Sequence, residues 1–263
     1  MQYLKQEQED AKDTDPKNWP EFKKAEKKYR LYQKKTTDFS ELIDLSKYDK
    51  NMGSICEKFE LKDKKTNKTY EAFKFFFPEG LYVVRDFLPI EDQLEVSKRC
   101  LNEYHKKPNR TNMYIYDPET ANKDEPIPTY DISKFLVDDP EKYYFNKKIR
   151  WANVGYQYDW NERKYPSGKT SIPEFLAQYP QKIIDLLGFS AYTPESVIIN
   201  YYDKKNYMGG HLDDGELDQI SPIISFSMGL SCVFLIGGPT RETKPHAIKL
   251  DSGILTGIFF SRL

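Results

Sequence analysis

Short apolar runs alternate with turn residues along the last quarter of the chain. From residue 195 onward they read SVIINYYD, IISFSMG, SCVFLIGG, HAIKLD and GILTGIFFS. Each run has the length of one strand, and turn residues separate it from the next. This spacing is typical of an antiparallel β-sandwich or barrel.

Apolar residues recur every three or four positions in three earlier segments, which predicts helices over residues 21–35, 90–107 and 173–187. The second helix is expected to turn Leu94, Leu101 and Tyr104 inward. The third stops at Gly188, where a glycine commonly ends a helix. Together with the later strands, the pattern predicts a mainly β fold with flanking helices.

Composition changes near residue 76. The first 18 residues are polar, and residues 36–75 are mixed, with a lysine-rich stretch, KDKKTNKTY, that reads as a loop. Dense apolar sequence starts with FKFFFPEGLYVVRDFLP. We therefore expect residues 1–75 to form a charged, partly disordered and helical N-terminal extension, and residues 76–263 to form a folded domain.

Charge and cysteine content set limits on partners and compartment. The 263 residues include 40 Lys and Arg against 41 Asp and Glu, so any surface that attracts nucleic acid must be local. Three cysteines without a C-x-x-C pair favour a reducing intracellular compartment. Because no apolar run approaches 18 residues and no signal peptide is evident, neither a membrane nor export is expected.

His211 and Asp213 form the pair with the clearest chemical potential. On a strand, residues two apart point to the same side, so both side chains could hold one metal ion. Two histidines and one carboxylate on one face bind iron in non-haem Fe(II) oxygenases. The alternative is a polar pair on a surface loop. Neither His105, on an outer helix, nor His246, after a proline-containing turn, is expected to be a ligand.

An ordered set of motifs surrounds this pair. N-Y-Y precedes H-x-D, and E-L-D-x-x-x-P-I-I-S-F-S-M-G, S-x-x-F-L-I-G-G, S-G and F-S-R-L follow it. Over residues 78–263 the chain resembles the AlkB family of Fe(II)- and 2-oxoglutarate-dependent dioxygenases, and within that family the eukaryotic AlkB homologue 1 branch. The resemblance implies a double-stranded β-helix, or jelly roll, with helices packed outside.

The resemblance also implies an activity and its residues. His211 and Asp213 would be catalytic iron ligands, and Asn200 and Tyr202 would contact 2-oxoglutarate. With Fe(II), O2 and 2-oxoglutarate, the protein would oxidatively demethylate N-methylated bases in tRNA or DNA and release formaldehyde and succinate. From the residues alone, Asn200 and Tyr202 could equally satisfy loop amides at a strand edge.

The segment KKIRWANVGYQYDWNERKY combines basic and aromatic residues and resembles the nucleotide-recognition region of the family. Candidate substrate residues within it are Arg150, Trp151, Tyr156 and Tyr158. Its other basic and aromatic residues are Lys147, Lys148, Trp160, Arg163 and Lys164. The alternative is that the tyrosines pack on a helix. The expected partner is tRNA or unpaired DNA, bound by a monomer in the nucleus, cytoplasm or mitochondrion.

One departure from the family pattern lies at the end of the sequence. In the family, a second histidine ligand follows the S-R-L motif, and two arginines that bind 2-oxoglutarate come later, whereas this sequence ends at Leu263. By the resemblance we expect two of three iron ligands, a jelly roll without its C-terminal strand, and little activity. The alternative function is a non-catalytic module that binds nucleic acid or protein.

Overall fold

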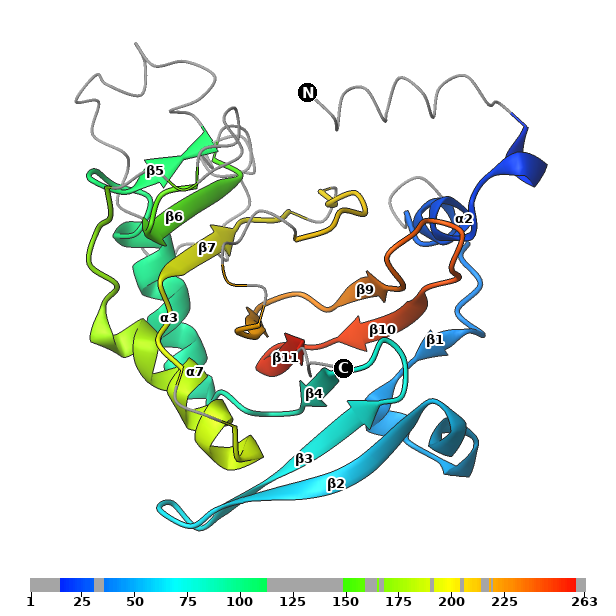
Figure 1. The fold of residues 1–263 in the computed structure, drawn as a ribbon, viewed down its shortest axis with the longest axis horizontal. Coiled ribbons are helices and arrows are strands. Elements are labelled where there is room, and N and C mark those ends of the chain that lie inside the picture. The colour runs from blue at the N-terminus through cyan, green and yellow to red at the C-terminus, as the bar shows by residue number, and fades with distance from the viewer. Residues whose placement is uncertain are drawn as a thin grey trace. The chain divides into compact units, whose positions relative to one another are not determined.

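The chain folds into two compact units, each assembled from separate stretches of sequence (Figure 1). A computed structural model describes residues 15–30, 36–112, 149–158, 165, 168–189, 192–203, 206–213, 218 and 220–258. The first unit comprises Met1–Glu60, Tyr70–Phe87 and Tyr207–Leu263, and the second comprises Leu61–Thr69 and Leu88–Asn206. Neither unit is therefore one continuous segment of the sequence.

The first unit contains two β-sheets. One has the order β1-β10-β9, formed by Leu42–Ile43, His246–Leu250 and Cys232–Ile236. The other has the order β2-β3-β4-β11-β8, formed by Cys56–Asp63, Lys68–Phe75, Leu81–Val84, Ile254–Ile258 and Ile223–Ser227. The last three residues of β2 and the first two of β3 are grouped with the second unit. The strand β1 is parallel to β10, while the pairs β10–β9, β3–β4, β11–β4 and β11–β8 are antiparallel. The five strands expected after residue 195 are all present, although β7 belongs to the second unit.

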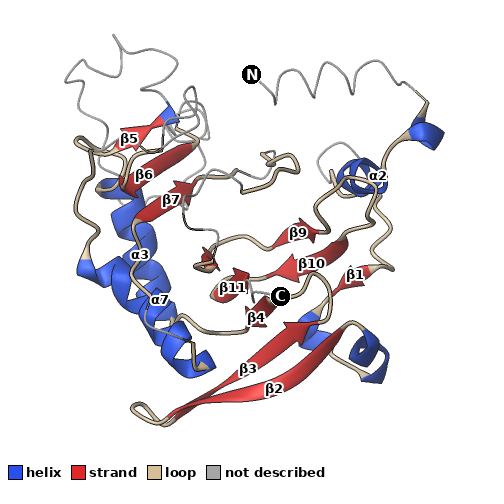
Figure 2. Ribbon diagram, in the orientation of Figure 1, coloured by secondary structure: helices blue, strands red, loops and turns tan. Residues whose placement is uncertain are grey.

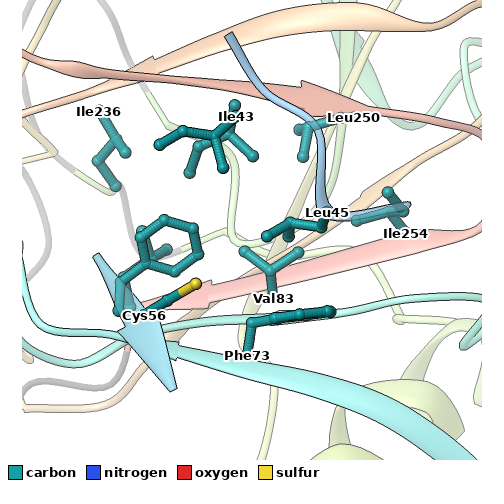
Figure 3. Close-up of a cluster of buried hydrophobic side chains, with 11 residues drawn as sticks. Ile43, Leu45, Cys56, Phe73, Val83, Ile236, Leu250 and Ile254 are labelled. Carbon is teal, nitrogen blue, oxygen red and sulfur yellow. The ribbon is translucent and has the colours of Figure 1, made fainter. Parts of the chain in front are cut away.

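Side chains from both of these sheets meet in one hydrophobic core (Figure 3). Phe73, Val83 and Ile248 are fully buried. The whole cluster consists of Ile43, Leu45, Cys56, Phe73, Phe75, Leu81, Val83, Ile236, Ile248, Leu250 and Ile254. Burying such side chains removes apolar surface from water, which is the main favourable contribution to folding. The two sheets therefore form a sandwich, in agreement with the expected β class.

The structure differs from the expected N-terminal extension. Residues 42–75 supply β1, β2 and β3, and both long strands of this set show alternating burial. The lysines of the KDKKTNKTY stretch lie at the ends of these strands and in the turn between them. The composition was polar because several charged side chains of these strands, such as Lys58 and Lys74, are exposed, although Phe73 and Phe75 lie in the core.

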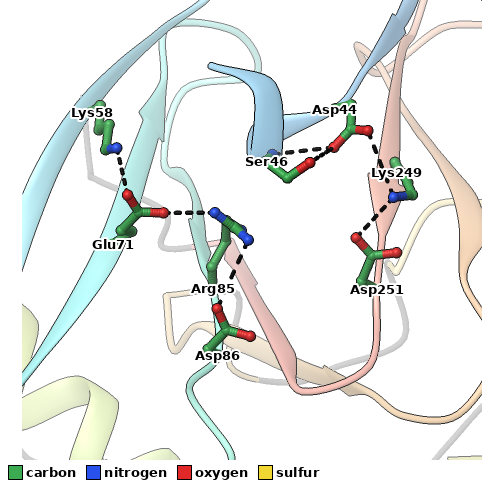
Figure 4. Close-up of polar contacts among 8 residues, drawn as sticks. All are labelled: Asp44, Ser46, Lys58, Glu71, Arg85, Asp86, Lys249 and Asp251. Atoms are coloured by element: carbon green, nitrogen blue, oxygen red, sulfur yellow. Dashed lines mark hydrogen bonds and ion pairs between the residues drawn. The ribbon is translucent and has the colours of Figure 1, made fainter.

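Ion pairs connect neighbouring strands on the polar side of the first unit (Figure 4). The Glu71 carboxylate on β3 contacts Lys58 Nζ on β2 at 2.5 Å and Arg85 Nη1, just after β4, at 2.7 Å. Lys249 Nζ on β10 lies 3.1 Å from Asp251 and 3.6 Å from Asp44. These side chains are partly exposed, and such pairs each contribute less than about 1 kcal/mol. They help to set strand register more than they add stability.

The second unit places helices beside a small antiparallel sheet (Figure 2). The sheet has the order β5-β6-β7, formed by Arg110–Thr111, Trp151–Gly155 and Ser196–Asn200. Its helices are α3, Ile90–Asn102, and α7, Glu174–Leu187. The Arg99 guanidinium of α3 lies over the Phe175 ring of α7, 4.8 Å from its centroid. The Tyr201 hydroxyl, just after β7, donates to the Cys100 carbonyl of α3 at 2.6 Å.

Both helices occur where the sequence predicts them, although α3 ends at Asn102 and not at Lys107. Of the three residues predicted to point inward, Tyr104 is buried and Leu101 is half-buried. Val96 and Cys100 are buried, whereas Leu94 is 54% exposed. The prediction for Leu94 was therefore wrong. Gly188 ends α7 with a φ of 74°, as the sequence predicts. Within the ranges that the structure describes, no helix is long and apolar enough to cross a membrane.

The N-terminal helix α2, Glu21–Lys28, begins just after a short 3-10 turn at Pro16–Asn18. Two further 3-10 turns, Leu45–Lys47 and Lys50–Ser54, connect β1 to β2. Helix α2 lies against the connection between β9 and β10 (Figure 1), where the Phe22 amide donates to the Arg241 carbonyl at 2.9 Å. The helix predicted over residues 21–35 is thus confirmed for its first eight residues, and residues 31–35 lie outside the described part of the chain.

Candidate functional site

Residues 207–213, here called the histidine loop, carry the candidate metal ligands in the first unit. His211 Nε2 lies 3.4 Å from Asp213 Oδ1. The loop is not a strand, so the two side chains meet through the local path of the chain after Gly209 and Gly210 and not through strand periodicity. The structure thus places the pair on a loop, as in the alternative reading, and the expectation of a shared strand face is wrong, although the two side chains still lie close together.

A second contact fixes the orientation of the histidine ring. His211 Nδ1 lies 3.0 Å from the Gly209 carbonyl oxygen, so a proton on Nδ1 is donated to the backbone. Metal-binding histidines usually donate their other ring N–H in this way, which leaves the opposite nitrogen with its lone pair. Here the opposite nitrogen is Nε2, which faces Asp213. The two side chains are 36% and 48% exposed, so a cation could reach them.

Electrostatics at this pair also favour a cation. The hydrogen bond to Asp213 raises the pKa of His211 above its ordinary value. A position that attracts a proton between an imidazole and a carboxylate attracts a metal ion for the same reason. His211 and Asp213 therefore fit two of the three ligands of an iron site. No third His, Cys, Asp or Glu gathers with them among the residues that the structure describes.

The other two histidines lie in apolar surroundings. His105, in the second unit, is only 2% exposed, and burial lowers its pKa to about 4. In the first unit, His246 packs against the rings of Phe75 and Phe77, with centroids 6.0 and 5.9 Å away, and burial again lowers its pKa. Neither histidine lies in the histidine loop, so the expectation that neither is a ligand stays a prediction.

Helix α2, through Glu26, and Arg30 just after the helix contact the histidine loop, and sequence reasoning identified neither residue. The Gly210 amide donates to Glu26 Oε1 at 2.6 Å, and the Arg30 guanidinium lies 4.1 Å from the centroid of the Tyr207 ring. In the sequence, Glu26 is one charged residue among many on a lysine-rich helix. Its partner is 184 positions away and is a backbone amide, so no side-chain pattern indicates the contact.

In the second unit, Asn200 ends β7 directly opposite Trp151 of β6. Directly opposite residues of an antiparallel pair point to the same face of the sheet. Asn200 is exposed, and Tyr202 is 55% exposed, whereas the intervening Tyr201 points to helix α3. Asn200 and Tyr202 are therefore exposed in this unit, and Trp151 is half-buried on the same face as Asn200.

The remaining candidate substrate residues differ in their accessibility. Arg150 is exposed and its guanidinium contacts the Asn206 side chain. The Tyr156 ring is half-buried, with Lys169 Nζ 5.0 Å from its centroid. Tyr158 is 9% exposed and packs against Tyr165, which supports the packing alternative for this ring. Lys147, Lys148, Trp160, Arg163 and Lys164 lie outside the described residues.

Comparison with known protein families identifies the superfamily to which the chain belongs. The sequence profile of the 2OG-Fe(II) oxygenase superfamily matches residues 80–257. The chain belongs to this superfamily. Membership implies a jelly-roll fold and the use of Fe(II), 2-oxoglutarate and O2, as the sequence motifs predicted, and the His211–Asp213 pair fits the iron chemistry of such a protein.

Relatives define the branch of the family. A DNA N(6)-methyladenine demethylase, ALKBH1A, from Arabidopsis thaliana is 29% identical over 93% of this chain and 82% of its own length. The tRNA demethylase abh1 of Schizosaccharomyces pombe is 28% identical over 90% and 80%. The human nucleic acid dioxygenase ALKBH1 is 33% identical over 71% of this chain and 49% of its own length, so the chain spans about half of it.

These relatives confirm the resemblance to the AlkB family and to its homologue 1 branch. A solved structure described as "The structure of OsALKBH1" covers 68% of this chain and 79% of its own, with a TM-score of 0.45 and 18% identity.

Proposed function

We propose that the protein is a nucleic acid dioxygenase that oxidatively demethylates N-methylated bases. The observation that carries this proposal is the arrangement at His211, where Nδ1 bonds to a backbone carbonyl and Nε2 faces Asp213 at 3.4 Å. This arrangement occurs in a chain that matches the 2OG-Fe(II) oxygenase superfamily. The relatives named above include a DNA demethylase and a tRNA demethylase, which supports methylated nucleic acid as the substrate.

The loop residues would act by holding the metal. His211 Nε2 and the Asp213 carboxylate are the ligands, and the Gly209 carbonyl keeps the imidazole in the tautomer that binds. When bound, iron would use O2 and 2-oxoglutarate to hydroxylate the N-methyl carbon, one oxygen atom going to succinate and the other to the carbon, with CO2 released and the hydroxymethyl group then lost as formaldehyde. The protein's own task is to fix the metal and to orient the methyl group.

Asn200 and Tyr202 would bind 2-oxoglutarate through the Asn200 amide and the Tyr202 hydroxyl. Their exposure, with Tyr201 turned to α3, supports this role. Each neutral hydrogen bond of this kind contributes about 0.5–1.5 kcal/mol, so losing one would weaken cosubstrate binding without abolishing turnover.

Trp151 would stack on a base, and Arg150 would contact a phosphate. A methylated base must leave the duplex, or come from an unpaired strand, to reach such a site. Aromatic rings beside cationic groups are what single strands require. We accordingly propose unpaired DNA or tRNA as the substrate of a monomer that works inside the cell, in the nucleus, cytoplasm or mitochondrion.

Product analysis tests this function. The full chain is supplied with Fe(II), ascorbate, 2-oxoglutarate and a single-stranded oligonucleotide carrying N6-methyladenine, or with methylated tRNA. Because the described residues supply only two iron ligands, little product is expected from this chain by itself. Formaldehyde and succinate are expected, with at least one of these substrates, from the chain joined to a family-like segment that supplies the third histidine. In that joined form, His211→Ala and Asp213→Ala should reduce both products to background. Asp218→Asn serves as the control, since this carboxylate is exposed and only caps a turn through Ser221.

The alternative, a non-catalytic binding module, predicts a different result. Such a module would bind the oligonucleotide without releasing formaldehyde or succinate, and His211→Ala would leave its affinity unchanged. That combination would replace the enzymatic proposal.

A further inference from the structure

Helix α2 lies against the histidine loop inside the first unit and contacts it just before the metal ligand. Glu26 Oε1 accepts a hydrogen bond from the amide of Gly210, the residue that precedes His211. The Glu26 side chain is only 13% exposed. A carboxylate that accepts from a backbone amide away from solvent makes one of the stronger hydrogen bonds in proteins.

We propose that Glu26 is a positioning residue that holds the backbone of the histidine loop so that His211 and Asp213 keep the spacing that a metal requires. The proposal rests on the metal-binding role given to these two residues above. It extends that role to an N-terminal helix that supplies no ligand itself.

The ring of Phe22 reinforces this contact. A Cβ atom on Gly210 would lie 2.5 Å from Phe22 Cε1, so the helix approaches the loop as closely as a glycine allows. At the beginning of the loop, Arg30 lies over the Tyr207 ring. Two adjacent glycines, Gly209 and Gly210, would otherwise leave the loop with large conformational freedom. Contacts with α2 therefore limit the backbone motion of Gly209 and Gly210, the most flexible residues of the loop.

The helix is itself anchored, so it can act as a support. The Phe22 amide bonds to the Arg241 carbonyl at 2.9 Å, and Arg241 Nη2 lies 3.8 Å from Glu26 Oε2. At its C-terminal end, Lys28 Nζ contacts Glu41 at 2.6 Å and Asp38 at 3.2 Å. Metal affinity depends on groups that orient the ligands as well as on the ligands themselves. Removing the support should therefore weaken metal binding although both ligands remain.

The test compares Glu26→Ala, Glu26→Gln and the control Glu21→Ala. Glu21 lies on the same helix and forms an exposed ion pair with Lys24. The readouts are Mn(II) affinity, measured by titration, and hydrogen exchange of a peptide that covers residues 207–213 without metal. We expect Glu26→Ala to weaken Mn(II) binding about tenfold and to speed exchange of the loop. Glu26→Gln keeps an oxygen acceptor and should stay within about threefold of wild type.

The outcomes separate this inference from the proposed function. If His211→Ala binds Mn(II) as tightly as wild type, the metal role fails, while loop exchange still reports on the support. If Mn(II) binding depends on His211 but Glu26→Ala matches Glu21→Ala in affinity and exchange, the positioning role is wrong. Thermal melting identifies a variant that does not fold. In that case Phe22→Leu replaces Glu26→Ala, with the same expected losses, and wild-type behaviour of Phe22→Leu would equally contradict the proposal.

Discussion

A few side chains account for the binding role proposed for each unit. In the first unit, the His211 ring is oriented by a backbone carbonyl and faces a carboxylate, which suits a metal ion. In the second unit, Trp151 and Asn200 share one face of a small sheet. The types of these residues could be predicted from the sequence, because H-x-D and N-Y-Y are chemically informative. Their partners could not, because the contacts involve the backbone carbonyl of Gly209 and the backbone amide of Gly210, which donates to the Glu26 carboxylate.

Trp151→Ala tests the substrate surface. If the ring stacks on an unpaired base, affinity for a single-stranded oligonucleotide should fall by about 1–3 kcal/mol. Trp19→Ala provides a matched control, because this tryptophan lies in the first unit beside Lys23 and Lys27. Fluorescence anisotropy measures both affinities. Equal affinities for wild type and Trp151→Ala would show that the ring only packs within its unit.

The buried ring of His105 should make the free energy of unfolding depend on pH. Burial lowers its pKa from 6.5 to about 4, so the folded protein keeps this ring neutral while the unfolded chain binds a proton. Between these two pKa values the unfolded state holds more protons, and the free energy of unfolding therefore falls as the pH falls. The loss from this group should be about 1.5 kcal/mol between pH 6.5 and pH 5. Urea unfolding of wild type and His105→Gln measures it.

Between pH 6.5 and pH 5, the free energy of unfolding of His105→Gln should fall by about 1.5 kcal/mol less than that of wild type. His246, whose pKa burial also lowers, is present in both proteins and cancels in the comparison. Parallel pH dependence of the two proteins would show that His105 does not titrate as its burial implies.

At the level of elements, helices and strands with a local sequence signal were predicted, whereas features that depend on distant parts of the chain were not. The five late strands and the end of α7 at Gly188 were predicted, since short apolar runs between turn residues and a C-terminal glycine are local signals. The strands β2 and β3 were missed because lysines on their exposed faces made the segment read as polar. Leu94 was wrongly placed inside because helical spacing identifies a possible apolar face and not the neighbour that covers it.

Gly188→Ala tests the end of α7. The residue has a φ of 74°, which an alanine adopts only with strain, although nothing lies within 4 Å of the added Cβ. The substitution should cost about 1 kcal/mol of stability through the backbone alone. Gly168→Ala is the control, as it meets equally open space without a positive φ, and it should be neutral or slightly stabilising. Equal melting temperatures of the two variants would contradict this account.

At the scale of the whole molecule, the residues proposed for catalysis are distributed over both units. His211 and Asp213 belong to the first, and Asn200, Tyr202 and Trp151 belong to the second. The chain passes between the units after Asn206, only five positions before His211. Sequence motifs could indicate the family because they are read in order along the chain. Sequence alone could not reveal that strands from before residue 76 complete the sheets of the first unit.

The central claim is that the histidine loop holds iron in a form that 2-oxoglutarate can bind. An anaerobic titration of the full chain with Fe(II) and 2-oxoglutarate tests it, because chelation of Fe(II) by a 2-oxo acid produces a visible charge-transfer absorption. The account predicts this absorption for wild type, its loss in His211→Ala and Asp213→Ala, and its retention in Asp218→Asn. Absorption that survives in both ligand variants, or that never appears in wild type, would contradict the account.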